Sequence, residues 1–309
     1  MKRKLLIGLA VVLGLVALVG VIGLTARSIP ATSKYAIDIE AWRSLAASLP
    51  GPRPSEVRVL EIATNRVGQW IAIEGGSFGE TFDMRGYAFQ VRWADGRSLI
   101  IDPINDAASQ EEFFPHATLD AAAWLEMQAA MLEAEAIIAT HEHFDHVNGL
   151  TKSPHFDALV SKAIFSRAQV DADLRLGLSG IDDRTRAGAQ VVDYRGAHAL
   201  RPGIVLIEAP SHTPGSQLIY LRLADDRELL MVGDVAYNAA NIRRPATRPR
   251  IVEWAMGEQG ENTAHWLRAL NDLARAHPEV KQIVAHDRDT VEPLVQAGNL
   301  GQGFVVDGG

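Results

Sequence analysis

The sequence Thr-His-Glu-His-Phe-Asp-His at residues 140–146 is the most informative stretch of the chain. Four potential metal ligands stand close together within it: His141, His143, Asp145 and His146. Three imidazoles and a carboxylate at this spacing would lose their hydration in a packed interior, which is costly without a compensating partner. Because a bound metal ion removes that cost, the stretch predicts a metal centre.

The surroundings of this cluster indicate two metals rather than one. A short apolar run of strand length precedes it at 136–140 and a turn signal follows it, so the cluster lies at the end of a strand. A loop in that position can direct the first two histidines to one ion, and Asp145 and His146 to a second. Imidazole and carboxylate ligands suit zinc, and ligand type also allows manganese, iron and cobalt. The competing interpretation is a histidine-rich surface loop without a metal.

Composition restricts the ligands and the substrate class. The chain has 309 residues, 47% of them hydrophobic and 22% charged, which is ordinary for a globular protein with a large core. It contains no cysteine, so every metal ligand must be a histidine, aspartate or glutamate. The formal net charge of −8 disfavours nonspecific binding to nucleic acid or to anionic lipid. We therefore expect a small-molecule substrate and no nucleic-acid partner.

The N-terminal residues predict a membrane segment. Three cations at 2–4 precede residues 5–24, which contain no charged or polar side chain and are long enough to cross the roughly 30 Å apolar core of a bilayer. Cations on the cytoplasmic side place the rest of the chain in the periplasm or outside the cell. A cleaved signal peptide, which would release a secreted protein, is the alternative. The apolar run exceeds the usual roughly 7–15 residues and Leu24-Thr25-Ala26 is a poor cleavage site, so we expect a retained anchor at 1–27.

The remaining chain divides into a short linking segment and one larger domain. Residues 28–56 contain two proline-rich breaks around a possible helix at 37–47, which predicts a tether and packing segment. Strands are then predicted at 57–62, 70–73, 87–93, 98–101, 136–140, 191–194, 204–207, 217–223, 228–232 and 280–285. Helices are predicted at 119–135 and 260–276. This order favours an α/β sandwich in which helices cover two sheets, formed as one domain by residues 57–309.

Three further potential ligands follow predicted strands. They are His212, within Ala-Pro-Ser-His-Thr-Pro-Gly-Ser at 209–216, then Asp234 and His286. Loops after strands are where an α/β scaffold presents functional side chains, so we expect these loops to converge with the first cluster. The other histidines follow no predicted strand and are interpreted as surface or capping residues: His116, His155, His198, His265 and His277.

These motifs resemble those of the metallo-β-lactamase-fold hydrolase superfamily over essentially all of residues 57–290. The pattern His-x-His-x-Asp-His at 141–146, followed by the three later ligands in the same order, fills every ligand position of its dinuclear members. The resemblance implies a four-layer αββα sandwich with two metals at one edge of the sheets. It also implies one metal held by His141, His143 and His212, and a second held by Asp145, His146 and His286, with Asp234 bridging the two.

Differences between this sequence and particular branches of the superfamily reduce the number of activities to be expected. The chain has Asp234 and no cysteine, unlike most β-lactamases of this fold, and it has His143 where flavodiiron oxidoreductases typically carry glutamate. Nuclease members act on polyanions, which suits an acidic, exported chain poorly. The resemblance is therefore strongest to the N-acyl homoserine lactonases and the glyoxalase-II-like thioesterases. A phosphodiesterase or nuclease and a noncatalytic membrane-tethered binding protein are the remaining alternatives.

Tyr237 favours the lactonase branch. Lactonases carry a tyrosine three residues after the bridging aspartate, and Tyr237 stands at that spacing from Asp234. The implied mechanism has a metal-bridging hydroxide attacking an ester or lactone carbonyl. A metal and the Tyr237 phenol stabilise the oxyanion, and Asp145 or Asp234 carries the proton to the leaving alkoxide. The competing interpretation is that Tyr237 only packs at the start of its loop.

Other residues near these motifs have less specific interpretations. Asp102, after the strand at 98–101, is a candidate to orient a ligand imidazole. The arginine-rich segment 243–250 follows Tyr237 and is interpreted as a solvated surface, with a cationic pocket lining as the alternative. Trp254 and Trp266 are interpreted as core residues rather than as a cover for an acyl chain. None of these features identifies the substrate.

Overall fold

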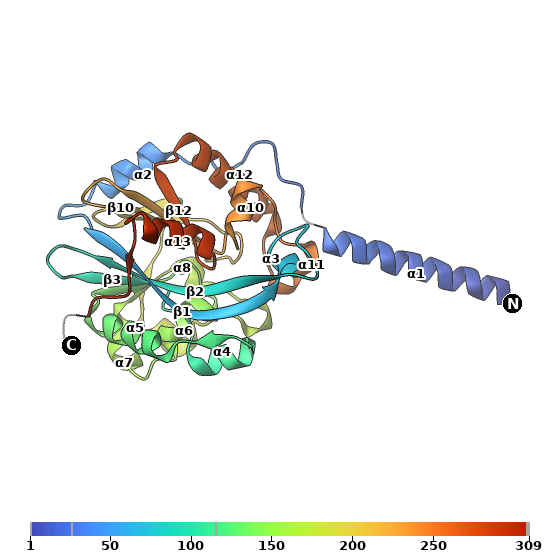
Figure 1. Ribbon diagram of the computed structural model, residues 1–309, viewed down its shortest axis with the longest axis horizontal. Coiled ribbons are helices and arrows are strands. Elements are labelled where there is room, and N and C mark those ends of the chain that lie inside the picture. The colour runs from blue at the N-terminus through green and yellow to red at the C-terminus, as the bar shows by residue number, and fades with distance from the viewer. Residues whose placement is uncertain (1, 26, 115, 307–309) are drawn as a thin grey trace.

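The computed structural model describes residues 2–25, 27–114 and 116–306, so parts of the predicted segments 1–27 and 57–309 lie outside the described residues. Two β-sheets pack face to face (Figure 1). The first has the order β13-β1-β2-β3-β5-β6-β7, with β4 paired to β1. Its strands are β1 (Glu56–Gly68), β2 (Thr81–Arg92), β3 (Ser98–Ile101), β4 (Thr118–Leu119), β5 (Ala136–Ile138), β6 (Ala163–Ser166), β7 (Gln190–Val192) and β13 (Gly301–Gln302). The second has the order β12-β11-β10-β9-β8 and consists of β8 (Ala197–Arg201), β9 (Ile204–Glu208), β10 (Gln217–Arg222), β11 (Glu228–Gly233) and β12 (Val280–Val284).

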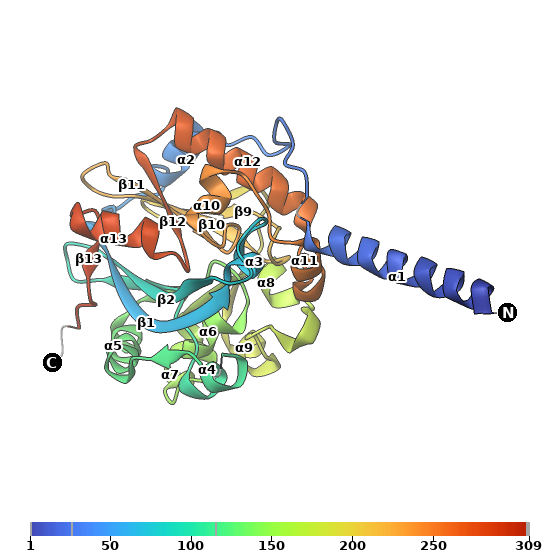
Figure 2. The same ribbon diagram turned by 45° about the vertical axis from the view of Figure 1, so that its right-hand side comes forward.

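Helices cover the outer face of each sheet (Figures 1 and 2). The first sheet is covered by α4 (Ala107–Phe113), α5 (Ala121–Glu133), α6 (Phe144–Thr151) and α7 (Phe156–Leu159). The second is covered by α2 (Ile39–Ala46) and α12 (Gly260–Ala276). The remaining α-helices of the globular part are α3 (Gln69–Ala72), α8 (Arg167–Asp171), α9 (Asp183–Gly188), α10 (Ala239–Arg243), α11 (Arg250–Met256) and α13 (Arg288–Gln296). The predicted layered α/β sandwich is confirmed.

Three apolar clusters hold these layers together. The first lies between the sheets and includes Phe89 and Ile219, which belong to different sheets. The second joins the first sheet to its helices through residues such as Ile137 and Met127. The third packs Trp266 of α12 and residues of α2 against the second sheet. Burial of apolar area, worth about 25 cal/mol per Å², therefore stabilises each layer contact. The predicted packing segment 28–56 contributes α2 to an outer layer.

Strand direction brings the ligand-bearing loops together. Strands β9 and β11 are parallel because both pair antiparallel with β10, and β12 is parallel to β11. Their carboxyl ends lie at one edge of the second sheet, which places the loops of His212, Asp234 and His286 side by side. The backbone N–H of Gln217 donates to the carbonyl of Thr140 at 2.9 Å. This bond fixes the loop after β5 of the first sheet to the same edge.

The predicted strand at 70–73 is wrong, because these residues fall mostly in α3. Strands β1 and β2 pair as far as Gly68 and Thr81, so the segment between them has no strand beside it. The backbone closes a helical turn instead, in which the N–H of Ile73 donates to the carbonyl of Gln69 at 3.2 Å. A short apolar run fits both patterns, and the missing partner strand decides between them.

Helix α1 (Lys2–Leu24) projects away from the sandwich (Figures 1 and 2). Among the described residues, Lys4–Leu24 is the one helix long and apolar enough to cross a membrane, with a mean hydropathy of 3.1 and none of its apolar window buried. A signal sequence near an N-terminus has the same character. The helix is therefore a candidate membrane span or signal sequence.

Candidate metal centre

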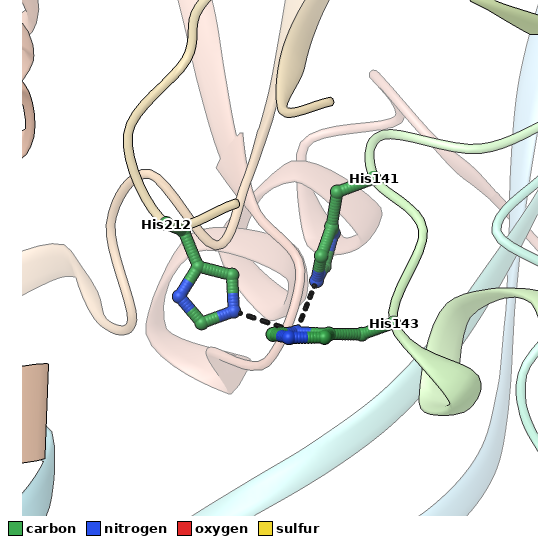
Figure 3. Close-up of side chains that lie close together, drawn as sticks. All are labelled: His141, His143 and His212. Carbon is green, nitrogen blue, oxygen red and sulfur yellow. Dashed lines mark hydrogen bonds between the residues drawn. The ribbon is translucent and has the colours of Figure 1, made fainter. Parts of the chain in front are cut away.

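One imidazole group consists of His141, His143 and His212, which come from two loops (Figure 3). His143 Nδ1 lies 3.1 Å from His141 Nε2 and 2.9 Å from His212 Nε2. All three residues are buried. Three ring nitrogens therefore converge on one point in the interior.

A second group contains His146, Asp145 and His286. His146 Nε2 lies 3.1 Å from His286 Nε2, and His286 Nε2 lies 3.7 Å from Asp145 Oδ2. Asp145 and His146 occupy the first turn of α6 rather than an irregular loop, so the second half of the motif is helical. Carboxylates are favoured at a helix N-terminus, which suits Asp145 to this position.

Asp234 lies between the two groups. Its Oδ2 is 3.5 Å from His212 Nε2, whereas its Oδ1 is 3.2 Å from His286 Nε2 and 3.5 Å from His146 Nε2. Gly233 precedes it with a φ of 54°, and a side chain there would meet Thr140 Cβ at 2.7 Å. Only glycine allows this turn, which directs one carboxylate towards both imidazole groups.

The chemistry of these residues fits divalent metal ions. In each imidazole group the facing ring nitrogens are so close that at most one nitrogen of a facing pair can carry a proton, so each group directs ring lone pairs towards a shared point. Asp234 Oδ1 is buried without a hydrogen-bond partner among the described residues. Cations placed between the converging nitrogens and the Asp234 oxygens would compensate this arrangement.

Contacts at Nδ1 orient four of the five imidazoles, three of them through hydrogen bonds and that of His146 through a carboxylate at ion-pair distance. His286 Nδ1 donates to the carbonyl of Arg85 at 2.7 Å, and His212 Nδ1 lies 2.6 Å from Glu258 Oε1. The Nδ1 atoms of His141 and His146 lie 3.2 Å from Thr140 Oγ1 and 3.1 Å from Asp102 Oδ2, respectively. A proton held on Nδ1 leaves Nε2 free as a ligand atom.

Asp102 occupies the predicted orienting position. Its φ of 53° is uncommon outside glycine, and its side chain is buried. The carboxylate accepts hydrogen bonds from the Thr140 backbone N–H at 2.6 Å and hydroxyl at 2.9 Å, in addition to its contact with His146. Asp102 therefore ties the end of β3 to the loop after β5 and to His146.

We expect Asp102→Asn to weaken metal retention by about 10- to 100-fold, as removal of groups behind metal ligands typically does. The amide keeps the volume but loses the charge that favours a proton on His146 Nδ1. Competition with a chelator measures retention in the purified protein. Unchanged retention in the Asn variant would mean that the carboxylate charge is unimportant to His146.

Arg248 and Glu258 are part of the centre but were not predicted. Arg248 is 6% exposed, and its guanidinium contacts Glu258 and lies 2.9 Å from His212 Nδ1. The interpretation of 243–250 as solvated surface is therefore wrong for Arg248, although Arg243 and Arg244 are exposed. The paired charges compensate each other's burial and hold His212 in place.

Glu142 lies between His141 and His143 in the sequence, but its carboxylate faces the loop of His212. Its carboxylate accepts hydrogen bonds from Thr213 Oγ1 at 2.9 Å and from the Gly215 N–H at 3.1 Å. A Cβ at Gly215 would meet Glu142 Oε2 at 2.4 Å, so glycine permits this close approach. Burial raises the pKa of Glu142 to about 7. Glu142 thus joins the loop of His141 to the loop of His212.

Burial also sets the protonation of the first imidazole group. It lowers the pKa of His143 to about 4, and it holds the pKa of His141 and the pKa of His212 well below the usual value. The charge of His146 lowers the pKa of His141 further, and the Arg248 guanidinium does the same for the pKa of His212. The three residues of the first group are neutral at neutral pH, which is the form that binds metal ions.

Tyr237 lies beside the second group. Its ring centroid is 5.6 Å from that of His286, and the Arg248 guanidinium lies 4.7 Å from the ring. The phenol donates to Met84 Sδ at 2.7 Å. Burial raises the pKa of Tyr237, so the hydroxyl keeps its proton at neutral pH. A small cavity beside Asp145 and His286 is lined by Met84 and further residues that include Ile104 and Phe114.

The remaining predicted residues lie elsewhere. Trp266 is buried in the core, as predicted, whereas Trp254 is 69% exposed on α11 and is not a core residue. The histidines interpreted as surface or capping residues are exposed or half-buried and belong to neither group: His116, His155, His198, His265 and His277.

A family model described as the metallo-beta-lactamase superfamily matches residues 84–286. No curated protein matches the sequence significantly. An N-acyl homoserine lactone hydrolase, solved with N-hexanoyl-L-homoserine at its catalytic metal centre, is 14% identical with a TM-score of 0.63, covering 78% of this chain and 96% of that one. An AiiA variant from B. thuringiensis, with N-decanoyl-L-homoserine at its active site, is 13% identical with a TM-score of 0.62 and coverages of 78% and 96%. AidC, a dizinc quorum-quenching lactonase, is 16% identical with a TM-score of 0.53 and coverages of 76% and 89%.

Proposed function

The chain belongs to the metallo-beta-lactamase superfamily, and from its candidate centre we propose that it is a hydrolase that uses two divalent metal ions to open an ester or lactone. The observation that carries the proposal is the position of Asp234. Its two oxygens face separate imidazole groups, at 3.5 Å from His212 and 3.2 Å from His286. A carboxylate so placed suits two cations better than one.

In this proposal each metal has its own protein ligands. One is held by His141, His143 and His212, the other by Asp145, His146 and His286, and Asp234 is shared between them. Zinc suits this donor set, which also accommodates manganese, iron or cobalt. When bound, two such cations polarise a carbonyl oxygen and lower the pKa of water towards neutrality.

Tyr237 supports a lactone as the substrate. Its protonated phenol lies beside His286 and donates only to a thioether, which is a weak acceptor. We propose that the phenol turns to donate to the oxyanion or to the ring oxygen of a lactone. Asp145 and Asp234 are the carboxylates placed to pass a proton to the leaving alkoxide. Two structures of similar fold hold N-acyl-L-homoserines, one of them named as the product of a lactone hydrolase, which adds support for this class.

Metal content is the first test. We expect close to two ions per chain in protein purified after growth with added zinc or manganese, because the Asp234 carboxylate faces both imidazole groups. Elemental analysis gives the ratio. The alternative of a noncatalytic binding protein with a decayed site predicts fewer ions, and a content below one per chain would rule out the two-metal proposal.

A substrate panel then distinguishes the possible reactions. Lactones, thioesters, phosphodiesters and β-lactams are offered to the same metal-loaded preparation. We propose that lactones give the highest kcat/KM. A preference for thioesters would instead favour the glyoxalase-II-like alternative while leaving the proposed metal centre intact.

We further propose that α1 is a retained membrane anchor and that residues 57–309 form the hydrolase outside the cytoplasm, with 28–56 as the linking segment. The contacts of α1 with α11 support retention, because the Arg250 N–H donates to the carbonyl of Thr25 at 2.9 Å. The cations at 2–4 favour a cytoplasmic N-terminus.

The topology gives a separate prediction. A reporter fused after Gly309 is expected to be active only in a noncytoplasmic format, and the full chain is expected to stay with membranes through a carbonate wash. Release of a shortened soluble protein would indicate signal cleavage instead. Cytoplasmic reporter activity would contradict both the anchor and the signal sequence.

A further inference from the structure

Exposed apolar side chains lie on α11, which contacts α1, and on two segments that are joined to it. On α11, Ile251 and Trp254 lie three residues apart and are 47% and 69% exposed. Leu176, in the turn Arg175–Gly177, is 75% exposed, and Phe78 after α3 is 72% exposed. We call these four residues the α1-proximal surface. Single exposed apolar residues are ordinary, but a group of them marks an interaction site.

Direct contacts fix α11 to the end of α1. The Arg27 guanidinium donates to Glu253 Oε2 at 2.8 Å, and the Arg250 N–H donates to the carbonyl of Thr25. Gly23 lies against Ile251, since a Cβ added to it would be 3.6 Å from Ile251 Cβ. In both views α11 and α3 lie where α1 meets the sandwich (Figures 1 and 2). The helix therefore leaves the protein at a defined place.

Leu176 is held beside α11 by its neighbour in the turn. Arg175 Nη1 donates to the carbonyl of Trp254 at 2.9 Å, and the guanidinium lies 5.7 Å from the Trp254 ring centroid. Both Arg175 and Arg250 are exposed. Two exposed arginines thus lie among the exposed apolar side chains of α11 and the neighbouring turn.

The Phe78 loop is joined to the same place through Thr247. The Thr247 carbonyl accepts the Glu74 N–H at 3.0 Å, and Thr247 Oγ1 accepts the Arg27 N–H at 3.1 Å. Phe78 itself stacks on Trp70 with a centroid distance of 5.6 Å. An aromatic pair therefore belongs to the segment that is joined through Thr247 to Arg27.

We propose that the α1-proximal surface rests on the lipid bilayer into which α1 inserts. The inference depends on the proposed anchor: a helix that enters the bilayer beside Ile251 brings the residues around its base to the headgroups. Tryptophan is favoured at this boundary, and arginine at 175 and 250 can pair with lipid phosphates. The apolar side chains are buried about 5–10 Å into the headgroup and acyl boundary, as in other interfacial segments.

Docking would also fix the metal centre relative to the membrane. Arg248 and Glu258, which contact His212, lie immediately before and after α11. The helix that carries Ile251 and Trp254 is thus continuous with the segments that hold a metal ligand. Contact with lipid restrains that helix and the supports of His212 together.

Spin labels on the full chain test the proposal. Because the sequence has no cysteine, Leu176→Cys and Trp254→Cys each give one labelled site. Leu125→Cys is the matched control, since Leu125 is a 62% exposed leucine on α5, away from α1. Val12→Cys reports on α1 itself. Each protein is reconstituted in vesicles of phosphatidylethanolamine and phosphatidylglycerol, and collisions with oxygen and an aqueous nickel chelate are measured by electron paramagnetic resonance.

We expect the labels at 176 and 254 to lose contact with the nickel chelate and to gain contact with oxygen, whereas the label at 125 stays fully accessible to nickel. A label at 12 that is shielded, combined with labels at 176 and 254 as accessible as the control, would overturn the docking surface and keep the anchor. A label at 12 that collides freely with nickel would overturn the anchor and the docking surface together. Neither result bears on the proposed hydrolysis, which metal content and the substrate panel test.

Discussion

Replacing Asp234 with alanine is expected to abolish hydrolysis of every substrate and to release at least one metal ion. The two carboxylate oxygens face His212 on one side and His146 and His286 on the other. Removing them takes a ligand from both proposed metals. The loss of activity should exceed the about 10- to 100-fold effect of removing a group behind a ligand. Elemental analysis and hydrolysis of a lactone and a thioester measure both consequences.

Asp171→Ala is a suitable control for this experiment, because Asp171 is an aspartate with a 63% exposed side chain on α8. It should retain metal and activity. Circular dichroism and thermal unfolding establish that the Asp234 variant is folded. Retention of two ions and of full activity in Asp234→Ala would show that this carboxylate holds neither metal.

The residues proposed as metal ligands have signals that are local in the sequence. His141, His143, Asp145 and His146 are adjacent in sequence, and the later ligands each follow a strand with a clear apolar pattern. The parallel direction of β9, β11 and β12 then places the loops of His212, Asp234 and His286 at one edge of the second sheet. Even so, sequence did not reveal that Asp145 and His146 begin a helix, because a four-ligand motif dominates the composition there.

Arg248 and Glu258 were not predictable in the same way. They reach His212 from 36 and 46 residues away in sequence, and neither lies in a motif. Arg248 belongs to a segment with four arginines, three of which are exposed. Charge patterning describes such a segment as a solvated surface. Which one of its arginines is buried depends on tertiary packing around α11.

The strands that the sequence pattern does not predict have a related explanation. β1 continues to Gly68 past Ala63 and Asn65, which are poor strand signals, because β2 supplies a partner along this length. The predicted strands also lack β4, β6, β8 and β13, which are only two to five residues long. In each case hydrogen bonding to a neighbouring strand stabilises an extended segment that its own sequence marks weakly.

The final prediction concerns the phenol of Tyr237. Tyr237→Phe is expected to lower kcat for a lactone by about 10- to 1000-fold, the range for loss of one oxyanion donor, while metal content stays unchanged. The fold should tolerate the change, because the hydroxyl donates only to Met84 Sδ. A thioether is a weak acceptor that is left unpaired at little cost. Steady-state kinetics with a lactone and a thioester, together with elemental analysis, measure the effect.

Tyr220→Phe is the matched control, since Tyr220 is a fully buried tyrosine on β10 that packs against Trp42 beneath α2. It removes the same atom far from the ligands and should leave kcat unchanged. A larger fall in kcat for the lactone than for the thioester in Tyr237→Phe would support the lactonase proposal. If Tyr237→Phe hydrolyses both substrates at the rate of the unchanged protein, Tyr237 only packs against Phe82 and Arg248. The proposed preference for a lactone would then lose its main support.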